Sequence, residues 1–200
     1  MTTIEGPDGL HRCRWCAGAA ELLPYHDREW GFPVGDDRRL FEKLSLEAFQ
    51  SGLSWRTILN KRAAFRAGFA DFDIDRVAAF TGADIARLLA DPGIVRHRAK
   101  IEAVINNAAR AQELIAEAGS LAAFVWRYEA RIAAPPQSRS TSPESEALSR
   151  ALKQRGWRFL GPTTVFAFMQ AMGLINDHAE GCISRDKAAA MRDSFMVPGR

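Results

Sequence analysis

The feature that most constrains the fold is a succession of helical segments that runs from Asp36 almost to the end of the chain. Apolar residues recur at helical spacing in each segment, and capping residues mark many of the boundaries. No stretch alternates polar and apolar residues as a half-buried strand does. The 200 residues therefore predict an all-α fold, with helices near 37–51, 55–68, 74–81, 84–90, 97–117, 121–131, 143–155 and 163–172.

The same signals divide the chain into regions. We expect residues 1–10 to form a flexible tail and residues 11–182 to form a single helical domain. A polar, proline-containing stretch at 133–142 is expected to be an internal loop. Residues 183–200 form the expected C-terminal tail, which can hold a weak helix.

Composition and charge narrow the classes of function. A net charge of +3 permits a nucleic-acid partner without requiring one. No apolar run is long enough to span a membrane, and the N-terminus lacks an apolar signal core, so we expect a cytoplasmic protein without a membrane partner. The three cysteines do not suggest a disulfide framework and favour metal binding instead. Nothing in the sequence indicates an oligomer, so we expect a monomer.

Glu47 is a carboxylate in an unusual place. It follows Leu40 by seven residues and Leu44 by three, so it falls on the apolar stripe of its helix. A carboxylate that faces the interior is costly unless something pairs with it. A turn at 52–54 and Trp55 follow directly, and this arrangement suggests a pocket.

Two explanations of Glu47 stay open. In the first, it lies at the edge of the core and pairs with Lys43 or Arg62, which is the common outcome for an isolated glutamate. In the second, it belongs to a binding pocket with aromatic walls, namely Tyr25, Trp30 and Trp55. Aromatic faces next to a carboxylate favour a flat cation, although each aromatic residue taken alone also fits an ordinary core.

Cysteine and histidine side chains gather near both ends of the chain. Cys13, Cys16 and His26 lie near the N-terminus, and His178 and Cys182, one helical turn apart, lie near the C-terminus. Two sulfurs and two imidazoles make a tetrahedral zinc set, although spacing does not choose between the first two cysteines. With four protein ligands the zinc would be structural and would fasten the irregular N-terminal segment to the C-terminal one. The alternative is separate buried side chains, but two half-sites at opposite ends favour a metal.

The segment 91–96 predicts a hairpin between two helices. Gly93 allows a tight turn, and the next helix begins beside it with free backbone N–H groups. These groups, with Arg96, Arg98 and Lys100, can hold a DNA phosphate without reading sequence. The alternative is an ordinary helix corner with a solvated basic turn, and the hairpin alone favours that alternative.

Several blocks of sequence occur in an order and spacing found in one known family. They lie at 12–15, 25–31, 47–55, 93–98, 161–164, 168–171 and 173–178, and Cys182 closes the set. Together they resemble the DNA-3-methyladenine glycosylase I family over about residues 12–182. Leu22 stands where the family usually has an aromatic residue, and Ala99 where it has glycine.

The resemblance implies an all-helical fold of the helix–hairpin–helix glycosylase superfamily and the removal of 3-methyladenine from alkylated double-stranded DNA. It implies a structural Zn²⁺ and leaves Cys16 as an extra thiol, the ligands being Cys13, His26, His178 and Cys182. It also implies contacts to the flipped base, with Trp30 as a pocket wall, from Glu47, Tyr25 and Trp55.

The chemistry of the implied substrate suggests a mechanism. N3-methylation makes the adenine cationic, so its glycosidic bond is already weak and needs no general acid. The enzyme must find, flip and hold the base, and Glu47 as catalytic residue would accept a hydrogen bond from its exocyclic amine. Whether Glu47 also activates the water stays open. Gly52 and Leu53 could fill the gap left in the duplex.

No aspartate follows the hairpin where many related folds carry one, and no lysine occupies the position used by bifunctional enzymes. We therefore expect a monofunctional enzyme that leaves an abasic site. Two other classes stay open: a DNA-binding module without catalysis, and a zinc-stapled helical adaptor for protein partners. Glu47 together with Trp55 favours the enzyme.

Overall fold

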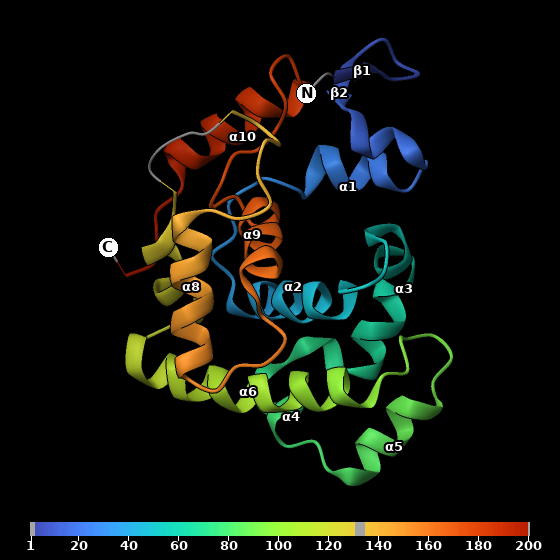
Figure 1. Ribbon diagram of the computed structural model, residues 1–200, viewed down its shortest axis with the longest axis vertical. Helices are drawn as coiled ribbons and strands as arrows, with labels where there is room; N and C mark the ends of the chain where they lie inside the picture. The colour runs from blue at the N-terminus through green and yellow to red at the C-terminus, as the bar shows by residue number, and fades with distance from the viewer. Residues whose placement is uncertain (1–2, 131–134, 200) are drawn as a thin grey trace.

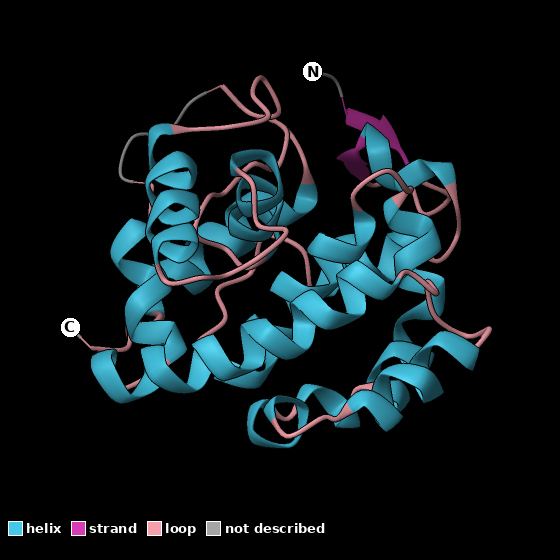
Figure 2. Cartoon of the chain, turned by 60° about the horizontal axis from the view of Figure 1, so that its bottom comes forward, coloured by secondary structure: helices cyan, strands magenta, loops and turns pink. Residues whose placement is uncertain are grey.

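The computed structural model of the chain describes residues 3–130 and 135–199. Helices dominate this part of the chain, as predicted, and two short strands form a small antiparallel sheet (Figures 1 and 2). The strands are β1 (Thr3–Glu5) and β2 (His11–Cys13). The helices, with three short 3-10 segments marked η, are η1 (Arg14–Gly18), α1 (Leu22–Arg28), α2 (Asp37–Gln50), α3 (Trp55–Gly68), η2 (Ala70–Phe72), α4 (Ile74–Ala78), α5 (Gly82–Ala90), α6 (Arg98–Ala118), α7 (Leu121–Val125), η3 (Trp126–Tyr128), α8 (Pro143–Gln154), α9 (Pro162–Ala171) and α10 (Ile183–Ser194).

Helix α2 crosses the middle of the molecule, between α9 and α6 (Figure 1). Asp36 caps its first turn, because its side chain accepts a hydrogen bond of 2.8 Å from the backbone N–H of Arg39. The sequence predicted one apolar stripe on this helix, but every residue at positions 40–49 is buried. The reason is that α3, α6, α7 and α9 all pack against α2. Charged residues on this helix therefore need partners.

The predicted helix boundaries agree with the structure within two residues for six of the eight segments. Helix α5 begins at Gly82 rather than 84, because Thr81 and Asp84 form a capping box ahead of it. The same cap makes α4 end early, at Ala78. The helix expected at 121–131 ends as α7 and η3 at Tyr128, and residue 131 lies outside the described residues.

The two ends of the chain hold more regular structure than the sequence indicated. Residues 3–5, within the stretch expected to be a tail, pair with residues 11–13. Helix α1 was not expected, because Pro24 and the lack of a clear period concealed it. Residues 183–194 form the regular helix α10. In the expected internal loop, residues 135–142 contain no helix or strand, and residues 133–134 lie outside the described part.

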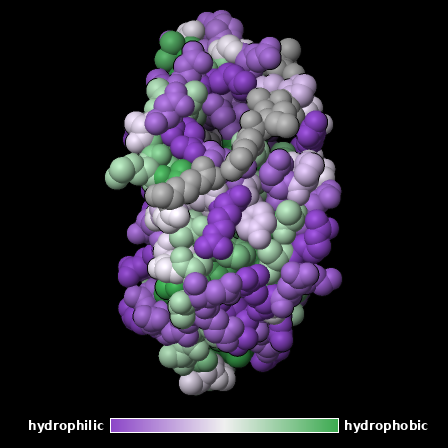
Figure 3. All heavy atoms as spheres, turned by 90° about the vertical axis from the view of Figure 1, so that its left-hand side faces the viewer, coloured by the Kyte–Doolittle hydropathy of each residue, from purple (hydrophilic) through white to green (hydrophobic). Residues whose placement is uncertain are grey.

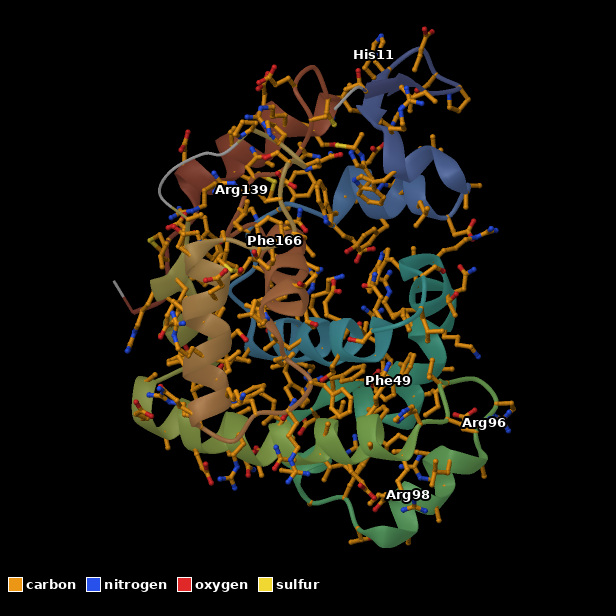
Figure 4. All side chains as sticks on the ribbon, viewed as in Figure 1. His11, Phe49, Arg96, Arg98, Arg139 and Phe166 are labelled. Atoms are coloured by element: carbon orange, nitrogen blue, oxygen red, sulfur yellow. The ribbon has the colours of Figure 1, made fainter. Side chains whose placement is uncertain are left out.

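Phenylalanine side chains fill the core between α2, α3 and η2. The ring of Phe49 lies 4.6 Å from that of Phe65, and the rings of Phe69 and Phe72 stack at 5.6 Å (Phe49 is labelled in Figure 4). Hydrophilic side chains cover most of the face formed by α8 and α10 (Figure 3). Among the described helices, none has the length and apolar character needed to cross a membrane.

The turn after α9 packs so tightly that it requires glycine, which yields a first prediction. Gly173 has φ of +78°, and a Cβ there would lie 2.5 Å from the backbone nitrogen of Pro33. Gly119, after α6, has φ of +86° but no atom near its Cβ position. We expect Gly173→Ala to lower the free energy of unfolding by more than about 2 kcal/mol, and Gly119→Ala by only about 1 kcal/mol. Denaturant unfolding of both variants measures the difference, and equal losses would show that the close contact with Pro33 is unimportant.

Candidate active site and metal centre

A buried cluster of four side chains joins the two ends of the chain. Cys13 ends β2, His26 lies in α1, His178 precedes α10 and Cys182 is the N-cap residue of α10. Their ligand atoms all lie within 4.8 Å of one another. Three sulfur–nitrogen distances among them fall between 3.4 and 3.8 Å. Tetrahedral zinc with ordinary bond lengths places such atoms about 3.5 Å apart, so the cluster can hold a metal ion.

Hydrogen bonds orient both imidazole rings toward the sulfurs. The Nδ1 atom of His26 lies 2.8 Å from an oxygen of Asp27, and the Nε2 atom of His178 lies 3.0 Å from the backbone oxygen of Trp30. These contacts assign the proton of each ring to the nitrogen that faces away from the cluster. Arg12 in turn holds Asp27 through hydrogen bonds of 2.9 and 3.0 Å. Metal-binding histidines ordinarily have partners of this kind, so the surroundings also fit a metal.

The thiols complete the donor set. The contact between the two sulfurs lowers the pKa of Cys182 and raises that of Cys13, so the pair alone stabilises a single thiolate. A divalent cation between them would stabilise two. Cys16 stays outside the cluster, where its thiol donates to the backbone oxygen of Cys13 at 3.0 Å. The structure thus distinguishes the two cysteines that sequence spacing could not.

A cavity of about 230 Å³ opens beside Glu47. We call it the aromatic pocket, and its lining consists of Trp15, Tyr25, Trp30, Lys43, Glu47, Gln50, Trp55, Gln137, Ala167 and Gln170. All four residues that the sequence predicted for base binding are among them. Tyr25 comes from α1, Trp30 from the turn after it, Glu47 from α2 and Trp55 from the start of α3. Trp15, Lys43, Gln50 and Gln170 were not nominated as site residues, because no local pattern marks a residue that reaches the pocket only through folding.

A larger cavity of about 570 Å³ lies against α10. Its lining includes Ala130 and Pro135, which flank residues outside the described part. It also includes Arg139, Arg185 and Arg192 together with carboxylates such as Glu129 and Asp177, but no tryptophan or tyrosine lines it. The aromatic pocket is therefore the candidate active site.

Glu47 is both paired and next to a cavity. Only 5% of its surface is exposed, and its Oε1 atom lies 2.7 Å from the ammonium nitrogen of Lys43, one helical turn earlier. The same ammonium donates to the hydroxyl of Tyr25 at 2.8 Å and lies 3.3 Å from the ring centroid of Trp55. The core-edge explanation correctly anticipated an ion pair. The pair nevertheless borders an open pocket, so the carboxylate is available to a ligand that displaces Lys43.

Burial shapes the charges of this pocket. Desolvation raises the pKa of the Tyr25 hydroxyl well above its usual range, so the phenol stays neutral. Desolvation also lowers the pKa of Lys43, while the neighbouring Glu47 opposes that change. Arg62, the other partner considered for Glu47, pairs with Glu29 at 2.5 Å instead.

The predicted hairpin connects α5 to α6 and is held from both sides. The backbone N–H of Gly93 donates to Asp91 at 2.7 Å, and the ammonium of Lys61 donates to the oxygen of Gly93 at 3.1 Å. A Cβ on Gly93 would lie 2.8 Å from the Cβ of Ala64, so only glycine fits against α3. Arg96 extends outward from this loop (Figure 4). The hairpin therefore presents an exposed basic side chain on a rigid support.

Lys100 has a different environment from the one expected. The sequence nominated it for DNA binding, but it is buried and donates to the backbone oxygens of Phe49 and Ser51 at 2.9 and 2.7 Å. It thereby pairs carbonyls at the end of α2 that the helix itself leaves without partners. The turn that follows carries Gly52, with φ of +82°, and Leu53, which is 42% exposed. Lys100 thus holds the turn in place from behind.

Comparison with known proteins agrees with this geometry. The model of the methyladenine glycosylase family matches residues 15–185. The chain belongs to the methyladenine glycosylase family. It is 42% identical over 179 residues to DNA-3-methyladenine glycosylase 1 of Escherichia coli (strain K12), which spans 86% of this chain and 96% of the relative. The predicted family, and with it the enzyme class of hydrolases acting on N-glycosyl bonds, is confirmed.

Solved structures of methyladenine glycosylases share the fold. One describes 3-methyladenine recognition by 3-methyladenine DNA glycosylase I from Staphylococcus aureus; it is 38% identical, with a TM-score of 0.81, and covers 87% of this chain and 96% of its own. Another, a variant of 3-methyladenine DNA glycosylase I in complex with 3-methyladenine, is 37% identical, with a TM-score of 0.82, and covers 87% of this chain and 97% of its own. The helical architecture predicted from sequence is therefore that of the family.

The cluster generates a second prediction. Cys182→Ser removes one of four ligands, so we expect bound metal to be lost and the melting temperature to fall by about 5 °C or more. Cys16→Ser is the matched control, since it removes a buried thiol that lies outside the cluster and should leave the metal content unchanged. Elemental analysis and calorimetry of both variants test this. A Cys182→Ser protein with the metal content of the wild type would exclude the assignment.

Proposed function

We propose that this methyladenine glycosylase flips 3-methyladenine out of alkylated double-stranded DNA and hydrolyses its N-glycosyl bond, leaving an abasic site. The observation that carries the proposal is the buried carboxylate of Glu47 at the wall of an aromatic pocket. Such a pocket favours a flat, positively charged ring over a neutral one. The relative solved in complex with 3-methyladenine supports the choice of base.

The reaction needs little chemistry from the protein. The methylated base is already cationic, so the electrons of the C1′–N9 bond leave with a good leaving group. Glu47 accepts a hydrogen bond from the exocyclic amine and holds the charged base. Tyr25 and Trp55 provide faces for stacking, and Trp30 closes one wall. Water adds to the sugar carbon and releases a proton to solvent.

We assign a monofunctional mechanism. Among the lysines in the described part of the chain, Lys43 is the one that lines the aromatic pocket. Its ammonium lies over the indole of Trp55, where the base rather than the sugar would be held. A Schiff base with the sugar would require an amine at the mouth of the pocket. The proposed product is accordingly an intact strand with an abasic site.

DNA contacts are proposed at two turns. The Gly93 hairpin, with Arg96 and Arg98, would hold phosphates at the N-terminus of α6. The turn at Gly52 and Leu53 would enter the space vacated by the flipped base. Lys100 contributes by fixing that turn through the carbonyls it pairs.

We propose zinc as the metal, because two thiolates and two imidazoles are the donor set that tetrahedral Zn²⁺ prefers. With Cys13, His26, His178 and Cys182 as ligands no position is left for a reactive water, so the ion would be structural. We further propose that residues 11–182 act as one domain of a monomeric enzyme. We place this enzyme in the cytoplasm, because that is where bacterial DNA is repaired.

Replacement of the carboxylate tests the mechanism. Glu47→Gln keeps the shape of the side chain but removes its charge, so we expect release of 3-methyladenine from methylated DNA to fall by about 10²-fold. Glu113→Gln, at an exposed position of α6, is the control and should keep full activity. Circular dichroism confirms folding of both. Wild-type rates from Glu47→Gln would refute the role of this carboxylate, and no base release by the wild type would favour a DNA-binding module.

The hairpin generates a separate prediction. Arg96→Ala should reduce the slope of log affinity against log salt for duplex DNA by about 1, because one phosphate contact and its released counterion are lost. Arg150→Ala, at an exposed position of α8, removes the same charge elsewhere and should leave the slope unchanged. Titrations from about 50 to about 200 mM salt measure it. Equal slopes for Arg96→Ala and the wild type would place the phosphate contact elsewhere.

A further inference from the structure

The ammonium of Lys43 occupies the position in which the aromatic pocket would hold its base. It contacts three proposed base-binding groups at once: the carboxylate of Glu47 at 2.7 Å, the hydroxyl of Tyr25 at 2.8 Å and the ring of Trp55, whose centroid is 3.3 Å away. Only 6% of the Lys43 side chain is exposed. A positive charge of the protein itself, the ammonium of Lys43, thus already occupies the aromatic pocket.

A stacked base and this ammonium exclude each other. Atoms in van der Waals contact lie about 3.5–4.0 Å apart, so a base on this face of Trp55 would overlap the Lys43 nitrogen. The rings of Tyr25 and Trp55 are 5.1 Å apart and tilted by 41°. A base between two parallel rings needs about 7 Å, twice the contact distance. The base can therefore bind only after Lys43 has withdrawn.

We propose that Lys43 is a built-in competitor of the base, which must leave Glu47 and Trp55 before a base is held and which returns to expel the product. This inference rests on the proposed function and adds a step to it. Lys43 is accordingly a residue that sets how strongly the pocket retains any base.

The ion pair with Glu47 makes displacement of Lys43 costly in free energy. Withdrawal of the ammonium leaves a buried carboxylate unpaired, which is costly unless another positive group replaces it. The N3-methylated base in DNA is such a group, because it carries the charge that Lys43 takes away. The two carboxylates of the adjoining cavity, Glu29 and Glu42, are already paired with Arg62 and Arg66.

Cleavage of the N-glycosyl bond reverses the competition between the base and Lys43 for Glu47. When the C1′–N9 bond breaks, its electron pair stays on N9, so the base becomes neutral while the sugar carbon takes the positive charge and then the water oxygen. The water proton passes to solvent. The neutral base no longer compensates Glu47, and the ammonium of Lys43 regains both the carboxylate and the indole face. Return of Lys43 therefore favours release of the base.

Lys43 has a place to which it can withdraw. A second, small cavity of about 20 Å³ shares Tyr25, Lys43 and Trp55 with the aromatic pocket and extends to the carboxylates of Glu29 and Glu42. Arg39, Arg62 and Arg66 line this cavity too, and the last two already pair with those carboxylates. A withdrawn ammonium therefore finds no unpaired carboxylate there, which favours its return to Glu47. Burial lowers the pKa of Lys43 and the neighbouring Glu47 opposes that change, so desolvation partly offsets the ion pair in its present position.

The test is the affinity for free 3-methyladenine at a pH where this base is neutral. Lys43→Met retains the length of the side chain and removes the competing charge, so we expect its dissociation constant to fall about tenfold or more relative to the wild type, with equally stronger product inhibition of base release. Lys153→Met, at an exposed position of α8, removes a charge outside the pocket and should bind like the wild type.

A purely structural role for Lys43 predicts the opposite, since damage to the pocket weakens binding. Unchanged or weaker binding by folded Lys43→Met would overturn the inference, and Lys43→Gln, with the same expectation, replaces it if the methionine variant does not fold. Base release by the wild type is measured in parallel on methylated DNA. Failure of that assay rejects the proposed function, whereas wild-type release without tighter binding by the variants rejects only the role of Lys43.

Discussion

The structure depends on one constraint, the burial of α2 around its whole circumference. Four helices surround it, so the charged side chains at positions 42, 43 and 47 are buried away from solvent. Each must find a partner: Glu42 pairs with Arg66 of α3, and Glu47 pairs with Lys43. A carboxylate held in this way is desolvated and fixed in position, which is what recognition of a cationic base requires.

The metal cluster and the aromatic pocket share structural elements. Helix α1 carries Tyr25 and His26 at adjacent positions, and the backbone oxygen of Trp30 accepts from the ring of His178. Metal binding would therefore fix two pocket walls together with the chain ends. This explains how a segment made only of the short elements β2, η1 and α1 can line a site: a metal held by the cluster would supply the long-range anchoring that a hydrophobic core supplies elsewhere. Cys182, as the N-cap residue of α10, connects the cluster to that helix.

Lysines show where sequence reasoning about the site succeeds and where it stops. Helical spacing placed Lys43 one turn from Glu47, so an ion pair was foreseeable. The contact of this pair with Trp55 was not foreseeable, because it depends on how α3 packs against α2. Lys100 follows the hairpin in sequence and looks like a phosphate ligand, yet folding places the end of α2 within its reach. A basic residue near a turn carries no local sign of which acceptor it meets.

The sequence by itself determined most of the helix boundaries between α2 and α9 and the ligand types, because caps such as Asp36 and Ser54 act within one turn and are readable locally. It also determined that Glu47 falls on an apolar stripe, since helical period alone sets that position. Only the tertiary structure decided that α2 is enclosed on all sides and that Lys43 occupies the pocket. These outcomes depend on contacts between residues far apart in the chain, and such contacts follow from packing geometry rather than from local pattern.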